Sequence, residues 1–134
     1  MIDRLVDKAV ASLLETISGL SVFVGAEDNE PQLQTPFCVV WSNVTAVSGR
    51  EPVYSLETQI EYNSISGQDP IATTENIMSQ IDALISPGGN YSGQAGIVTA
   101  GLKYLAWESL ARSQESVGDR RKNMRALLVH AQMT

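Results

Sequence analysis

Two stretches of the chain repeat their apolar residues with the period of an α-helix. In the first, residues 2–17, an apolar stripe lies opposite polar side chains that include Asp7. The second, residues 71–85, follows Asp69 and Pro70, which suit an N-cap and a first helical position. The pattern therefore predicts two amphipathic helices, each with one face against a core.

Alternating apolar and polar residues, the pattern of a half-buried strand, are clearest in residues 54–63. The preceding segment, residues 37–47, is rich in β-branched and aromatic residues, and its first half is apolar on both faces. Only residues 48–52 separate the two, so we expect an antiparallel hairpin whose second strand has one face in water. Residues 22–24 predict a further short strand, and the glycine, acidic and proline residues of 25–36 predict a surface loop.

A second hairpin is predicted near the end of the chain, with arms at residues 102–110 and 123–133. Between the arms, residues 111–122 are polar and lack apolar periodicity, which favours a mobile loop. The order helix, hairpin, helix, hairpin predicts an α+β fold, an antiparallel sheet of about four to five strands (two hairpins) with two helices packed on one face. At 134 residues, we expect a single α+β domain over residues 1–134.

Composition and charge narrow the range of functions. The chain is 43% hydrophobic and 18% charged, and no apolar run reaches the length of a membrane-spanning helix, so we expect a soluble protein that does not bind membranes. The formal net charge of -6 argues against nonspecific binding of nucleic acid. Residues 1–111 carry thirteen acidic and four basic side chains, whereas residues 112–134 carry two acidic and five basic ones. The basic cluster is either a solvated loop or a surface that steers copies of the chain together head to tail.

Candidate catalytic residues are few. The chain has one histidine, His130, and one cysteine, Cys38, both in predicted strands among apolar residues, where a structural role is expected. The glycines that follow Pro87 lack the Lys-Ser/Thr ending of a phosphate-binding loop, and no serine lies in a Gly-x-Ser-x-Gly elbow. We therefore predict no catalytic residue, no cofactor and no metal site, and do not expect an enzyme. An enzyme with polar groups convergent on His130 or Cys38 is the least favoured alternative.

The predicted sheet has more apolar surface than two helices can cover. Three of its strands carry apolar side chains on both faces, including Trp41 and Trp107, and aromatic residues are favoured anchors at protein interfaces. Two interpretations remain open at this point. Either the second face contacts another protein, or residues 86–101 fold over it.

The length and order of these elements resemble one known family. The likeness lies in an amphipathic helix, a hairpin that ends in the alternating strand 56–63, a helix from Pro70 to Ile85, and two late strands split by a basic loop. This layout resembles the tail-terminator, or tail-completion, proteins of long-tailed bacteriophages over nearly the whole chain. Because the likeness rests on element order, it transfers no site residue. It implies a virion structural protein, assembled in the host cytoplasm, whose copies form a hexameric ring that caps the tail tube and joins it to head-side neck proteins.

A ring of this kind implies contacts between copies. We expect the basic residues of the late segment to contact acidic surface on a neighbouring copy, and DNA to pass through an acidic ring without specific binding, because like charges repel. The candidate interface residues are Arg112, Arg120, Arg121, Lys122, Arg125, Glu57, Glu61, Trp41 and Trp107. The alternative function is a small cytoplasmic module that binds an apolar ligand or a peptide against the open sheet face, as a monomer or dimer with a pocket.

Overall fold

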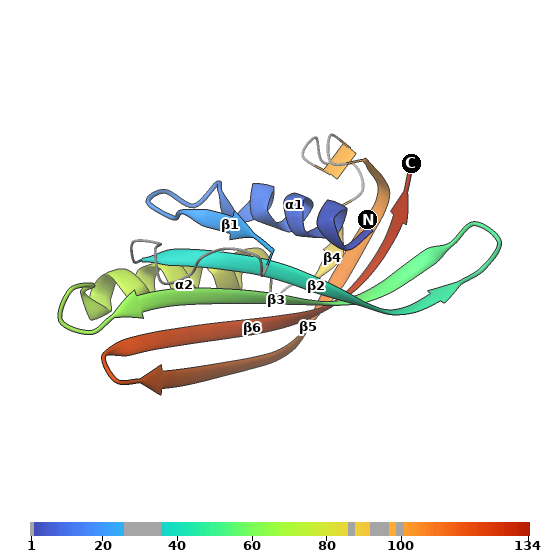
Figure 1. Ribbon diagram of the computed structural model, residues 1–134. Coiled ribbons are helices and arrows are strands. Elements are labelled where there is room, and N and C mark those ends of the chain that lie inside the picture. Colours follow the sequence, from blue (N-terminus) through green and yellow to red (C-terminus); the bar gives the residue numbers. More distant parts are fainter. Residues whose placement is uncertain (1, 26–35, 86–87, 92–96, 99–100) are drawn as a thin grey trace.

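The computed structural model describes residues 2–25, 36–85, 88–91, 97–98 and 101–134 (Figure 1). Its elements in chain order are α1 (Ile2–Leu14), β1 (Val22–Val24), β2 (Phe37–Ser48), β3 (Val53–Ile65), α2 (Ile71–Ile85), β4 (Gly89–Asn90), β5 (Leu102–Val117) and β6 (Arg120–Met133). The predicted α+β class and both predicted helices are confirmed. The surface loop predicted at 25–36 falls almost entirely outside the described residues.

The six strands form one sheet in the order β1-β2-β3-β6-β5-β4. β2 pairs with β3, β3 with β6, and β6 with β5, all antiparallel, so the two predicted hairpins lie side by side at the centre of the sheet. β1 runs parallel to β2, and β4 adds Gly89 and Asn90 at the opposite edge. The prediction of four to five antiparallel strands is therefore corrected to a mixed sheet that has six strands among the described residues. A two-residue strand such as β4 is too short to show alternation.

Both helices pack on one face of the sheet and share one hydrophobic core with it. Val6 and Leu14 of α1 and Ile81 of α2 are at most 1% exposed, and they belong to the same cluster as Leu56 of β3 and Leu127 of β6. The stripes read from the helical period are thus the buried faces. Burial of each such side chain contributes about 1.5–3 kcal/mol, so these stripes supply most of the free energy that holds the helices on the sheet.

The start of α2 differs by one residue from the prediction. The carbonyl of Pro70 accepts hydrogen bonds from the backbone N–H groups of Thr73 and Thr74, so Pro70 rather than Asp69 occupies the N-cap position. The Asp69 carboxylate accepts a hydrogen bond from the backbone N–H of Ile65 instead, at 2.6 Å. Asp69 is therefore held to the last residue of β3 and orders the turn between strand and helix.

Asp7 of α1 is buried, although the helical pattern places it among the polar residues. Asp7 is only 4% exposed, and its Oδ1 accepts a 2.6 Å hydrogen bond from the Ser42 hydroxyl of β2. The Ser42 hydroxyl also lies 2.7 Å from that of Thr58 on β3. Loss of water around the carboxyl group raises the pKa of Asp7 from 3.8 to about 6, and the hydrogen bond from Ser42 offsets this only in part. A polar network therefore joins α1 to the two strands beneath it.

The loop predicted near 111–122 is wrong, because the segment is a strand hairpin. β5 continues to Val117 and β6 begins at Arg120, so only Gly118 and Asp119 form the turn. Gly118 has a φ of 62°, a value that glycine adopts without strain and that suits the first central residue of a type II′ turn. Every residue of β5 from Glu108 to Val117 is exposed, which removes the apolar alternation by which a strand is recognised in a sequence.

Candidate interaction surfaces

Trp41 lies on the face of the sheet opposite the helices. The register aligns Trp41 of β2 with Gln59 of β3, Ala126 of β6 and Ala111 of β5, so these four residues form one row across that face. Trp41 is half-buried in this row, and Leu128 of β6 is half-buried on the same face. The predicted candidate Trp41 therefore sits on a surface that neither helix covers.

Trp107 does not share that face. It is 4% exposed within the core on the helix side, where its ring stacks on Tyr91 with centroids 3.9 Å apart and planes 19° apart. Trp107 is a predicted interface candidate, but in the folded chain its side chain is buried and does not lie on the surface where a partner could contact it. Tyr91 and Ile97, from the described part of segment 86–101, also pack into this core, so those residues do not cover the second face. The alternation of residues in the sequence assigns Trp107 to one face of β5, but only the three-dimensional structure shows that other residues cover this face at Trp107.

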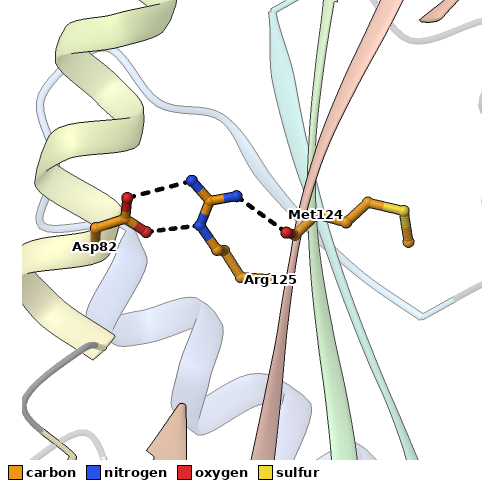
Figure 2. Close-up of polar contacts among 3 residues, drawn as sticks. All are labelled: Asp82, Met124 and Arg125. Atoms are coloured by element: carbon orange, nitrogen blue, oxygen red, sulfur yellow. Dashed lines mark hydrogen bonds and ion pairs between the residues drawn. The ribbon is translucent and has the colours of Figure 1, made fainter. Parts of the chain in front are cut away.

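Arg125 is bound within its own chain (Figure 2). From β6 its guanidinium donates to both carboxylate oxygens of Asp82 on α2, at 2.7 and 3.2 Å, and to the carbonyl of Met124 at 3.0 Å. The Arg125 side chain is 11% exposed. This two-point ion pair connects α2 to the sheet and explains how an arginine is accommodated beside the core. It leaves Arg125 with little capacity to bind a neighbouring protein.

Lys122 and Glu61 contact each other rather than a solvent-exposed partner. The Lys122 ammonium lies 3.5 Å from Oε1 of Glu61, while Oε2 of Glu61 accepts a 3.3 Å hydrogen bond from the amide of Asn63. Glu61 is 5% exposed and Asn63 is fully buried. The prediction that this face of β3 is exposed to water is therefore wrong at its C-terminal end. Glu57, nearer the other end, is half-buried and accepts a 3.0 Å hydrogen bond from Gln59.

The three remaining arginines differ in their surroundings. Arg121 is half-buried, donates a long 3.4 Å hydrogen bond to the carbonyl of Asp69, and lines a cleft of about 180 Å³ between α2 and the β5–β6 hairpin. Arg112 is exposed and lies opposite Arg125 in the register, and Arg120 begins β6 beside the hairpin turn. The side chains of Arg112 and Arg120 form no hydrogen bond or ion pair with another described residue. These two are the members of the predicted basic cluster that remain available to a partner.

Two long strand segments have open edges. β1 pairs with β2 only as far as Val40, and the outer edge of β2 has no strand partner among the described residues at positions 43–48. On the other side, β4 pairs only with Ala106 and Trp107, so the outer edge of β5 is likewise open over residues 108–117 in the described structure. Figure 1 shows the tips of the β2–β3 and β5–β6 hairpins pointing in opposite directions. Sequence reasoning identified the strand at 37–47 but not these open edges.

The sole histidine and cysteine have different environments. The Ser55 hydroxyl lies 3.1 Å from Nδ1 of His130 and is the described group that hydrogen-bonds to the ring. Cys38 is fully buried, and burial, with a smaller effect of the Glu61 charge, raises the pKa of its thiol from 9.0 to about 12. A thiol held in this state is a poor nucleophile at neutral pH. No group of three or more His, Cys, Asp or Glu side chains in the described ranges is placed to hold a metal ion.

Comparisons with known proteins provide no family assignment. The chain matches no protein-family model and no curated protein sequence. Among the helices in the described part of the chain, none is long and apolar enough to span a membrane. Function is therefore inferred from the surfaces of this chain and from the layout of its elements.

Proposed function

We propose that the protein is a structural subunit of a bacteriophage neck, a tail terminator whose copies form a ring, most simply a hexamer, that caps the tail tube and joins it to the head-side connector. The observation that carries this proposal is a sheet with two open strand edges, on opposite sides of one small chain. A subunit with an unpaired edge on each side can contact two neighbours at once, as a cyclic assembly requires. The resemblance in element order to tail-terminator proteins supplies the specific assembly.

Charge supports the same proposal. Arg112 and Arg120 are free to contact acidic surface on a neighbour, whereas the rest of the chain is predominantly acidic. Glu57 is the accessible acidic candidate of the two predicted, because Glu61 is buried against Lys122. The net charge of -6 per subunit would let DNA slide through the ring without adhering to its wall.

The first experiment is the native molar mass of the full chain, measured by sedimentation over a wide concentration range. A closed six-fold species supports the proposal, and incubation with purified tail tubes followed by electron microscopy should show the ring at the tube end. A chain that remains monomeric at every concentration and does not bind tail tubes overturns it. A monomer or dimer that binds an apolar ligand or peptide would instead support the binding-module alternative.

A charge-reversal experiment tests the basic contacts. Arg112→Glu combined with Arg120→Glu should weaken assembly, and the wild-type oligomer should itself weaken as salt rises, because exposed charges are screened within about 8 Å at physiological ionic strength. Lys103→Glu is the matched control, since Lys103 is an exposed lysine with a 3.7 Å contact to exposed Glu51. Equal assembly of the double variant and the control would refute the assigned role of the two arginines. A reconstruction of the ring with a strongly basic channel would refute the proposed passage of DNA.

A further inference from the structure

The open segment of β2 has few of the features that usually protect an edge strand. Residues 43–48 read Asn-Val-Thr-Ala-Val-Ser, with no charge, no proline and no glycine. All six are exposed, and Val44 and Val47 are 44% and 55% exposed. Soluble proteins normally protect such an edge with lysine, proline, a covering segment or a bulge, because unpaired backbone groups readily pair with another strand. In the described structure the segment has one of these features, a bulge between Val44 and Ala46.

The open segment of β5 is longer and also carries exposed apolar residues. Leu110 and Val117 are 53% and 60% exposed, so four of the six large hydrophobic residues exposed in the described structure lie on these two segments. A bulge interrupts β5 between Ser109 and Ala111, after which residues 111–117 pair with β6 without interruption. Glu108, Arg112 and Glu115 give this edge charges of both signs. Such an edge is less prone than that of β2 to pair with itself.

The direction of the strands determines how two copies can meet. β2, β3, β6 and β5 are neighbours in that order, and each pair is antiparallel, so β2 and β5 run in opposite directions. If a second copy lies beside the first with its sheet in the same orientation, its β2 is antiparallel to β5 of the first. The sheet then continues from copy to copy with the favoured hydrogen-bond pattern. Because the contact joins two different edges, it is head to tail and can close into a ring.

We propose that residues 43–48 of β2 pair with residues 111–117 of β5 in a second copy of this chain, and that this edge-to-edge strand pairing is the contact between subunits. The inference rests on the proposed function for the closure of the ring, whereas the pairing itself requires only self-association. Backbone hydrogen bonds supply the pairing, and exposed apolar side chains of the two strands are covered by it. A two-fold contact between two β2 edges would instead leave β5 open and stop at a dimer.

Cysteine cross-linking tests the pairing in the full chain. Asn43 of β2 and Ala111, Ser113 and Glu115 of β5 are exposed and lie on the face opposite the helices, as their register with β3 and β6 shows. Asn43→Cys in one copy is mixed under oxidising conditions with Ala111→Cys, Ser113→Cys or Glu115→Cys in another. Directly opposed strand residues have Cα atoms about 4.5–5.5 Å apart, within disulfide range. Cys38 is buried and does not interfere.

The pairing predicts that at least one of these mixtures gives a covalent heterodimer. Gln114→Cys is the matched control, because Gln114 is also exposed but lies on the other face of β5 and should not cross-link to position 43. Covalent dimers of Asn43→Cys alone, or no cross-link in any mixture, overturn the inference. A closed oligomer that forms without cross-linking overturns the edge pairing but leaves the ring proposal standing. Cross-linked chains that stay open support the pairing and count against the ring.

Edge charges provide a second test with an independent readout. Val44→Lys and Val47→Lys place a charge on the uncharged edge and should weaken self-association about tenfold or more, with little change in thermal unfolding. Val98→Lys is the control, since Val98 is 56% exposed and lies outside both open segments. If Val98→Lys weakens association as much as the β2 variants, the loss is not specific to the edge and the inference is overturned.

Discussion

The buried carboxyl group of Asp7 makes the stability of this protein depend on pH in a predictable way. In the folded chain the pKa of Asp7 is about 6, because burial disfavours the ionised form, whereas its ordinary value is 3.8. Between these two values the folded state binds the additional proton, so the free energy of unfolding falls as the pH rises. Above pH 6 Asp7 is ionised in both states, and its full destabilising effect is present.

The size of the effect follows from the pKa difference. A rise from 3.8 to about 6 corresponds to about 3 kcal/mol, at 1.36 kcal/mol per pH unit. Nearby charges act in opposite directions, since Asp3 raises the pKa and Arg4 lowers it, and both are weaker influences than burial. We therefore expect Asp7 to lower the free energy of unfolding by about 2–3 kcal/mol between pH 4 and pH 7.

Asp7→Asn removes this titration while the amide oxygen can still accept the hydrogen bond from Ser42. Urea denaturation of wild type and variant at intervals from pH 4 to pH 8 should show that the wild type loses stability relative to Asp7→Asn as the pH rises. Glu15→Gln is the matched control, because Glu15 is exposed just after α1 and its substitution should not change the slope. If the wild type and Asp7→Asn have the same pH dependence, the carboxyl group is not buried as described.

Three further predictions concern stability and reactivity. Arg125→Met leaves Asp82 without its two-point partner and should cost about 1–3 kcal/mol in urea denaturation. The Cys38 thiol, with its pKa raised to about 12, should react with a thiol reagent far more slowly in the native chain than in urea. Gly88→Ala should destabilise the chain more than Gly118→Ala, because a Cβ at Gly88 would lie 2.8 Å from the carbonyl of Trp107 whereas the space at Gly118 is open.

Each of these three predictions can be checked against a control in the same chain. Lys103 and Glu51 form an exposed ion pair at 3.7 Å, and Lys103→Met should cost less than about 1 kcal/mol. A cost equal to that of Arg125→Met would contradict the structural role of the Asp82 pair. Fast labelling of native Cys38, or equal unfolding temperatures for the two glycine variants, would contradict the other two predictions.

The elements that could be predicted from the sequence are those with one face buried in the core. Apolar residues recur at regular intervals in both helices and in the strand at 54–63, because a core covers one side of each. The buried residues Val6, Leu56 and Ile81 lie where these periods place them. Alternation cannot reveal what covers the other side. Asp7 and Glu61 are polar in the pattern yet buried in the fold, because each has a polar partner on another element. Asp7 accepts a hydrogen bond from Ser42 of β2, and Glu61 forms an ion pair with Lys122 of β6.

The hairpin at 102–133 was partly predictable, and the reason for the error bears on function. Gly118-Asp119 is a recognised two-residue hairpin sequence, and it stands between Val117 and Arg120, where it would have predicted the turn. The polar residues on either side favoured a loop, because a strand with neither face covered by a core has no reason to alternate apolar and polar residues. Such a strand is uncommon in an isolated chain, since its backbone groups remain unpaired along one edge. The proposed pairing with a second copy therefore rests on the unpaired backbone along this edge and on strand direction, and the absence of a hydrophobic pattern shows only that no core covers the strand.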